Sequence, residues 1–320
     1  MVRVLLNSFL GVVALAALAQ AAPTPLFGIN FASGEESDAK PTAVSQNNIT
    51  TDLQRPAQFS RAAYCPTDQV ENWSCGSSCT ALPNVKVLAA GGDDGEIPSF
   101  FIAQDPDQQT IVVAHQGTDP HKVLSIANDV EFKQVDANTT LFPQAGSGVQ
   151  LHSGFQATQG RTADLVLATV KSALADSGFK KVLVTGHSLG AAVASLDAAM
   201  LRMALSEDVA VSSVVFGLPR VGNSEWADLL NKLIPDFAHV TNQNDPVPTV
   251  PPHFLDFEHP EGELHITQVN NSTGAATMVA CPGSENQNCS AGNSVLDTSI
   301  QNHLGPYFNG ISFGDKACQS

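Results

Sequence analysis

Residues 180–205 read KKVLVTGHSLGAAVASLDAAMLRMAL. The apolar, β-branched run at 182–184 indicates a short strand buried on both faces. The pentapeptide Gly-His-Ser-Leu-Gly follows at 186–190, and residues 191–205, rich in Ala, Leu and Met, favour a helix. A strand, a Gly-x-Ser-x-Gly turn and a helix together lift the serine hydroxyl out of a sheet, beside the positive end of the helix. The stretch therefore predicts Ser188 as a nucleophile.

The rest of the chain predicts one α/β domain around this turn. Strands are expected at 85–90, 98–102, 109–116, 210–217, 237–242 and 264–269, and helices at 162–177 and 224–233. Strands that alternate with helices indicate a mostly parallel central sheet flanked by helices. We expect a single catalytic domain over residues 61–320. Residues 22–60, interrupted by prolines, are expected to be a loosely structured leader or a possible pro-segment, with a first helix expected at 53–64.

Residues 1–21 have the pattern of a secretory signal peptide. Arg3 precedes an apolar stretch at about 9–18, and Ala-Gln-Ala at 19–21 is a small-residue cleavage site. No later apolar run reaches about 18 residues, so we expect no stable membrane insertion. Six cysteines fit an oxidising compartment. We expect a secreted, extracellular monomer, glycosylated at some of its sequons, which begin at Asn48, Asn72, Asn138, Asn270, Asn271 and Asn288.

The net charge of −16 limits the partners of the chain. Such an excess of carboxylates argues against nucleic acid, because a phosphate backbone requires a basic surface. It argues equally against docking on anionic lipid. Adsorption to a neutral oil or ester surface is compatible with it.

A serine nucleophile needs a base, and the base needs a carboxylate that orients it. In sheets of this kind the chain order is serine, then acid, then histidine. Asp245 follows the apolar strand at 237–242, in a loop stiffened by two prolines, and is the preferred acid. Asp256 is the second choice, while Asp228 and Asp236 lie on or just after a predicted helix.

Four histidines follow these acids. His265 falls inside a strand pattern, which would fix it within the sheet. His303 lies in a late segment anchored by apolar residues and is the preferred base, ahead of His259 and His253.

Acyl transfer also needs hydrogen-bond donors aimed at the developing oxyanion. One is the backbone N–H of Leu189, directly after the nucleophile. Thr118, which lies just after the strand at 109–116, can offer a second N–H and a hydroxyl.

Six ordered blocks resemble the class 3, or filamentous-fungal, lipases, a family that includes some feruloyl esterases. These blocks are residues 112–118, 149–155, 182–190, 216–223, 241–248 and 302–308. The resemblance implies an α/β-hydrolase fold in one domain, with a short lid over the active site. It also implies a Ser188, Asp245 and His303 triad with Thr118 and Leu189 as the oxyanion hole. No metal or organic cofactor is implied.

The same resemblance implies three disulfides, Cys65–Cys318, Cys75–Cys79 and Cys281–Cys289, and a lid near Asp119–Phe132. Two features depart from the family: Gln116 replaces the usual arginine, and the expected lid tryptophan is absent. The apolar side of this segment fits either a lid that spreads on oil or a helix packed on the core.

The preferred function is a serine ester hydrolase that acts on acylglycerols at an oil–water interface. The alternatives are a feruloyl esterase or other carboxylesterase acting on plant cell-wall esters, and a non-catalytic secreted binding protein that keeps the fold.

Overall fold

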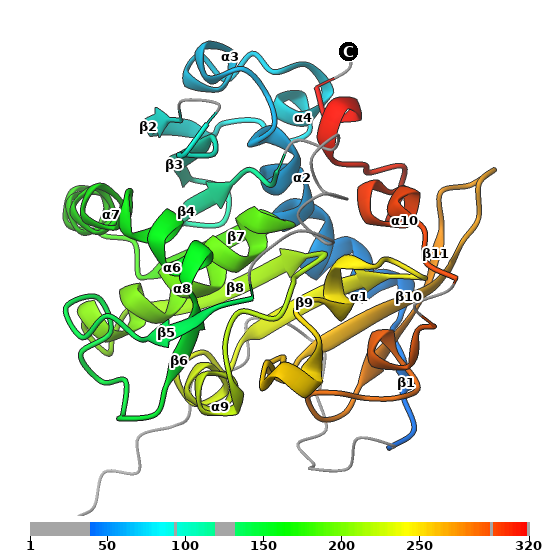
Figure 1. Ribbon diagram of the computed structural model, residues 1–320. Coiled ribbons are helices and arrows are strands. Elements are labelled where there is room, and N and C mark those ends of the chain that lie inside the picture. The colour runs from blue at the N-terminus through cyan, green and yellow to red at the C-terminus, as the bar shows by residue number, and fades with distance from the viewer. Residues whose placement is uncertain (1–38, 93–94, 119–131, 295–296, 319–320) are drawn as a thin grey trace, which may run out of the picture.

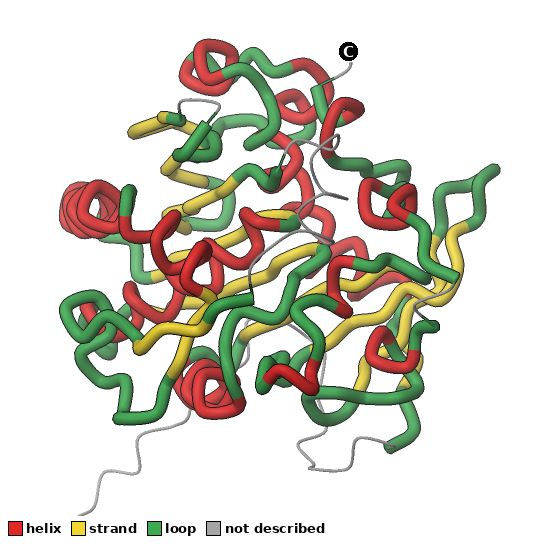
Figure 2. Tube along the Cα trace, in the orientation of Figure 1, coloured by secondary structure: helices red, strands yellow, loops and turns green. Residues whose placement is uncertain are grey.

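The computed structural model describes residues 39–92, 95–118, 132–294 and 297–318. This part of the chain forms a nine-stranded sheet in the order β1-β11-β10-β9-β8-β7-β4-β3-β2, with helices on both faces (Figures 1 and 2). The predicted signal peptide and most of the predicted lid, residues 119–131, lie outside the described residues.

The centre of the sheet is parallel. Its strands are β4 (Thr110–His115), β7 (Lys181–His187), β8 (Ala210–Phe216), β9 (Phe237–Asn242) and β10 (Glu263–Val269). Both faces are covered, so β4 and β9 are buried along their whole length. The carboxyl ends of these strands meet at one edge of the sheet, and the α/β fold expected from the sequence is confirmed.

Antiparallel strands extend the sheet on both sides. β2 (Lys86–Gly91) and β3 (Phe100–Asp105) continue it beyond β4, and β11 (Ala276–Cys281) and β1 (Thr42–Ala43) continue it beyond β10. A separate pair is formed by β5 (Gln134–Asp136) and β6 (Gln150–His152). The sequence analysis did not anticipate β1, β5, β6 or β11.

One face of the sheet is covered by α6 (Ser153–Gly160), α7 (Ala163–Ser177), α8 (Leu189–Ala204) and α9 (Ser224–Leu233) (Figure 1). Local signals set their ends. Gly178, at φ 72°, ends α7 in the left-handed conformation that glycine adopts without penalty. The Asn223 side chain begins α9 by accepting a hydrogen bond from Trp226 N–H.

The opposite face is covered by N-terminal helices and by the C-terminal segment. These helices are α1 (Gln46–Asn48), the π-helical η1 (Ile49–Leu53) and α2 (Gln54–Ala62). The apolar side chains of Ile49, Leu53 and Phe59 are fully buried there. α2 agrees with the helix expected at 53–64. Residues 42–53 form β1, α1 and η1, with Ile49 and Leu53 in the core, where a loosely structured leader was expected.

The remaining elements are short and lie in the connections. They are α3 (Thr67–Glu71), α4 (Gly76–Thr80), η2 (Val247–Thr249), η3 (His253–Leu255), η4 (Ser290–Gly292), α10 (Ile300–Leu304) and η5 (Gly314–Lys316). Disulfides join Cys65 to Cys318, Cys75 to Cys79 and Cys281 to Cys289. No helix among the described residues is long and apolar enough to cross a bilayer.

Candidate active site

Ser188 lies between β7 and α8, at the carboxyl edge of the parallel sheet. Its backbone has φ 60° and ψ −128°, a conformation that a non-glycine residue adopts only under strain. A hydrogen bond stabilises this strained conformation: Ser188 N–H donates to Phe216 O at 2.9 Å. The side chain is buried apart from a small exposed fraction of 4%.

Glycines allow this turn to close. A methyl group at Gly186 would lie 2.3 Å from Gly190 O, and one at Gly190 would lie 2.4 Å from His115 O. A methyl group at Gly117 would lie 2.8 Å from Ser188 Cβ. Each separation is shorter than a side chain tolerates, so these positions require glycine. Strands β4 and β7 thus bring their carboxyl ends into direct contact at the serine.

Asp245 and His303 meet although they are far apart in the sequence. His303 Nδ1 lies 2.8 Å from Asp245 Oδ2, and both side chains are buried. Asp245 Oδ1 accepts a second hydrogen bond, from Val247 N–H at 2.8 Å. Because a carboxylate only accepts, Nδ1 of His303 carries the proton. Its Nε2 is then a free base, and this buried atom has no hydrogen-bond partner among the described residues.

The imidazole of His303 lies against the serine turn. A methyl group at Gly217, the residue after Phe216, would lie 2.8 Å from His303 Cε1. Phe216 is the residue whose carbonyl holds Ser188 N–H. The base and the serine therefore flank the end of the same strand, β8.

The two expected oxyanion donors also lie at this edge. Leu189 begins α8, and the first N–H groups of a helix have no partner inside it. Thr118 follows Gly117 and is half-buried. Gln116, which replaces the family's usual arginine, is bound to Ser99. Its side-chain Oε1 accepts from Ser99 N–H at 2.9 Å, and its backbone N–H donates to Ser99 O.

His187 connects the serine turn to the base. Its Nε2 lies 2.8 Å from the backbone oxygen of His303, and its Nδ1 lies 2.6 Å from the Tyr64 hydroxyl. The carbonyl fixes the tautomer, so Nε2 donates and Nδ1 accepts from Tyr64. Burial, together with the neighbouring His303, holds the pKa of His187 well below its usual value. A neutral ring therefore lies 4.4 Å from the imidazole of His303, where it would not repel a positive charge.

Arg220 fixes the loop that carries Asp245. Its Nη1 donates to Thr249 O at 2.8 Å and to Pro251 O at 2.9 Å. Its other nitrogens, Nε and Nη2, bind Glu285 at 2.8 and 2.7 Å. Burial alone would raise the pKa of Glu285, but the hydrogen bonds and charge of Arg220, with His259, lower it to about 2. The pair is therefore charged, and it holds the acid loop against the segment closed by Cys281–Cys289.

The alternative acids are placed elsewhere. Asp256 is exposed on a turn, Asp228 is exposed on α9, and Asp236 is half-buried before β9.

The alternative bases have other partners. His259 Nε2 lies 2.8 Å from Pro248 O, so it supports the loop that carries Asp245. His265 Nδ1 is bound to the Thr241 hydroxyl at 2.8 Å inside the sheet. His253 is exposed and lies 3.6 Å from Glu258. Among the expected acids and bases, the structure brings together Asp245 and His303.

Two further histidines serve the fold. His115 Nε2 donates to Asp197 at 2.8 Å, and Gln159 donates to the other oxygen of the same carboxylate at 2.8 Å. His152 begins α6, where its Nδ1 accepts from the N–H groups of Gly154 and Phe155. Burial lowers the pKa of His152 to about 4, which keeps Nδ1 available as an acceptor.

One set of metal-type donors occurs among the described residues. Glu263, Cys281 and Cys289 have donor atoms within 4.8 Å of one another. The two cysteines are joined in a disulfide, and Glu263 accepts hydrogen bonds from Thr241 and from Ser290 N–H. These groups are already used, so the set does not fit a metal ion.

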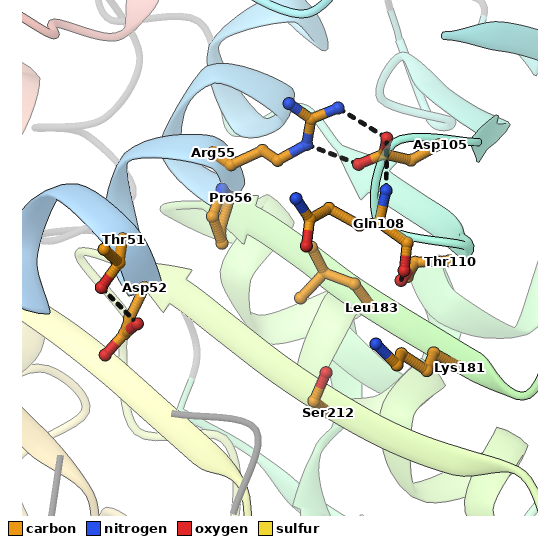
Figure 3. A pocket seen from close by; sticks show the side chains of 10 residues that line it. All are labelled: Thr51, Asp52, Arg55, Pro56, Asp105, Gln108, Thr110, Lys181, Leu183 and Ser212. Atoms are coloured by element: carbon orange, nitrogen blue, oxygen red, sulfur yellow. Dashed lines mark hydrogen bonds and ion pairs between the residues drawn. The ribbon is translucent and has the colours of Figure 1, made fainter. Parts of the chain in front are cut away.

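A polar pocket of about 130 Å³ lies at the opposite, amino-terminal edge of the parallel strands. Arg55 and Asp105 face each other at its rim through two contacts of 2.5 Å, with Lys181 and Ser212 on the strands beneath (Figure 3). Among the described residues that line it there is no histidine, and Ser188 is not one of them.

The comparisons place the chain in a family. The family described as Lipase (class 3) matches residues 112–255. The secreted mono- and diacylglycerol lipase MDL5 of Malassezia globosa is 32% identical over 228 residues, which cover 71% of each chain. The chain belongs to the class 3 lipase family. The chain is also 34% identical to the secreted mono- and diacylglycerol lipase LIP2 of Malassezia restricta, over 61% of that relative's length.

A solved structure agrees with the class 3 lipase assignment. It is a triacylglycerol lipase whose catalytic centre is formed by a serine protease triad. It is 27% identical, with a TM-score of 0.74, over 88% of this chain and 100% of that chain. The α/β-hydrolase fold that the resemblance implied is therefore confirmed.

The sequence analysis did not single out three residues that support the site: Tyr64, Arg220 and Glu285. Arg220 lies in one of the six blocks, at 216–223, which was a signal for it. Nothing local marks Glu285, because its partner is 65 residues away.

Proposed function

We propose that this member of the class 3 lipase family is a secreted, monomeric serine ester hydrolase whose substrates are acylglycerols. The observation that carries the proposal is the buried His303, which donates Nδ1–H to Asp245 and keeps Nε2 without a partner. Three other buried histidines, His152, His239 and His259, also have one nitrogen without a partner among the described residues, but their second nitrogen binds a backbone group, whereas that of His303 binds a carboxylate beside the Ser188 turn. The role of His303 Nε2 is to accept the proton of Ser188.

In the first half of the reaction, Ser188 Oγ attacks the carbonyl carbon of the ester. His303 Nε2 accepts the hydroxyl proton, and Asp245 stabilises the imidazolium and holds its orientation. The tetrahedral intermediate collapses, the bond to the alcohol breaks, and the alcohol leaves with the proton from His303. The acyl group remains as an ester on Ser188.

In the second half, water attacks the acyl carbonyl and gives a proton to His303. The bond to Ser188 breaks, the serine regains that proton, and a carboxylic acid is released. In both halves the negative oxygen is stabilised by Leu189 N–H and by Thr118, and each such donor lowers the barrier by about 3 kcal/mol. The neutral His187 ring beside His303 allows the imidazolium to form without a like charge as neighbour.

The substrate class rests on the relatives. Two are mono- and diacylglycerol lipases, and the solved structure is a triacylglycerol lipase. Secretion is supported by the names of the same relatives and by the signal-peptide pattern of residues 1–21. Binding at an oil–water interface follows from the low solubility of acylglycerols.

A fluorophosphonate probe tests the nucleophile. We expect one covalent adduct on Ser188 in the folded protein, and none in Ser188→Ala. A folded wild-type protein that stays unlabelled would favour a binding protein that keeps the fold. Emulsified tributyrin and dissolved methyl ferulate then separate the substrate classes, and faster cleavage of methyl ferulate would make the protein an aryl esterase.

A further inference from the structure

Two consecutive apolar side chains project into solvent just after the loop that carries Asp245. Among the described residues, the exposed large hydrophobic side chains are Leu88, Leu165, Phe254 and Leu255. Phe254 is 84% exposed and Leu255 is 41% exposed, whereas the other two occur singly. Single exposed leucines are ordinary, but a nearly fully exposed phenylalanine beside another apolar residue indicates a surface that binds something.

The turn under these side chains is held by hydrogen bonds. Leu255 N–H donates to Pro252 O, and Asp256 N–H donates to His253 O, both at 3.0 Å. Asp256 then reverses the chain at φ 64°, a conformation that aspartate tolerates better than most residues. The side chain of Gln134 donates to both Leu255 O and Asp256 O, at 3.2 and 2.8 Å. Phe254 is therefore presented by a fixed turn.

A second phenylalanine close to this turn is buried. Phe257, three positions after Phe254, has no exposed surface and packs near the ring of His152 at 6.0 Å. The chain thus buries one phenylalanine and leaves the other in water. An exposed Phe254 does not contribute the hydrophobic free energy that a buried phenylalanine contributes. A binding role at the surface accounts for its exposure.

The turn belongs to the active-site edge. It directly follows residues 245–252, the acid loop that Arg220 holds through Thr249 O and Pro251 O. A group that anchors the turn would therefore also fix the edge of the sheet where Asp245 meets His303.

The charge around the turn selects the partner. Residues 251–262 contain no lysine or arginine, and Asp256 and Glu258 follow the apolar pair. One basic side chain, the exposed Lys133, is next in sequence to Gln134, which binds the turn. With a net charge of −16 for the chain, an anionic bilayer would repel this surface. A neutral interface between ester and water accepts aromatic and aliphatic side chains without a basic face.

We propose that Phe254 and Leu255 form an anchor that inserts into a neutral ester–water interface and holds the active-site edge of the sheet against it. This inference deepens the proposed ester hydrolase function and rests on it. Adsorption and chemistry are separate properties, because neither side chain belongs to the Ser188, Asp245 and His303 group.

The test measures adsorption and turnover separately. Adsorption is measured in a Ser188→Ala background, so that the droplets are not digested, as partition of protein onto triolein droplets coated with phosphatidylcholine. We expect Phe254→Ser to lower the partition coefficient about tenfold and Leu255→Ser to lower it less. The matched controls are Leu88→Ser and Leu165→Ser, which remove side chains that are 41% and 49% exposed, on β2 and α7.

With Ser188 intact, all four variants should hydrolyse a dissolved ester such as p-nitrophenyl butyrate at the wild-type rate. The anchor is wrong if Phe254→Ser partitions like Leu165→Ser, if adsorption requires phosphatidylglycerol, or if Phe254→Ser impairs turnover of the dissolved ester. A wild-type protein that adsorbs through Phe254 but hydrolyses no ester would instead overturn the proposed function.

Discussion

The two ends of the same parallel strands hold buried acids with basic partners, and the two ends differ in what remains unpaired. At the amino-terminal end, Asp105 receives two hydrogen bonds from Arg55 and one from Gln108 N–H. At the carboxyl end, Asp245 binds one nitrogen of His303, and the other nitrogen has no partner in the part of the chain that the structure describes. The capacity for chemistry lies in that nitrogen, because it can accept a proton, whereas the guanidinium of Arg55 keeps its protons and offers no acceptor.

Replacing the two aspartates should separate chemistry from stability, with the largest effect of any change considered. Asp245→Asn should lower kcat about 10⁴-fold and leave the fold intact, because His303 loses the group that fixes its tautomer. Asp105→Asn should leave kcat unchanged and lower the free energy of unfolding by about 2 kcal/mol, because Arg55 loses its charged partner. Turnover of a dissolved ester and urea denaturation measure the two effects. A large loss of kcat in Asp105→Asn would show that the two ends are coupled.

The two arginines offer a second matched pair. Arg220→Gln should lower kcat about 10- to 100-fold with little change in KM, because the acid loop shifts when Thr249 O and Pro251 O lose their donor. Arg55→Gln should destabilise the protein without changing kcat. Equal kcat values in the two variants would contradict a positioning role for Arg220.

Acidification should destabilise the structure at the carboxyl edge of the parallel strands before it destabilises the amino-terminal edge. Burial lowers the pKa of His239 and of His259 to about 4. Between pH 6.5 and 4 the unfolded chain binds protons that the folded chain does not, so stability falls as the pH falls through this window. Each histidine should account for a loss of about 2 kcal/mol by pH 5.

Urea midpoints at pH 7.5 and 5 check this effect. His259→Gln should reduce the pH dependence, whereas His253→Gln, at an exposed position, should not. Hydrogen exchange should quicken in β9 and β10 before it does in β3. The opposite order would contradict the contrast between the two ends.

The smallest effect is expected at Lys181, which lines the amino-terminal pocket. Lys181→Gln should change the free energy of unfolding by less than about 0.5 kcal/mol and leave kcat unchanged. A clear change in kcat would give the pocket a role in turnover that its geometry does not indicate.

Local signals made the centre of the fold predictable from the sequence. β7, the turn at Ser188 and α8 were predictable because a β-branched run, two glycines and an alanine-rich helix adjoin each other. The end of α7 at Gly178 was predictable for the same reason.

Long-range contacts set what the sequence could not show. Residues 39–60 have a polar, proline-interrupted sequence. Ile49 and Leu53 nevertheless belong to the buried apolar cluster on the face of the sheet opposite α7 and α8. Four histidines were candidates for the base, and the sequence favoured His303 without giving its contacts. The fold supplies them: His303 meets Asp245, whereas His259 binds Pro248 O. Glu285 is invisible in its own sequence neighbourhood, because its role comes from Arg220.

The bond between Cys65 and Cys318 spans 253 positions of the chain. A protease that cuts one peptide bond anywhere between them would leave both pieces covalently joined. Such a nicked molecule would run as one band on a gel without reductant and as two bands with it. After such a cut, Ser188 and His303 would still belong to one covalently joined molecule.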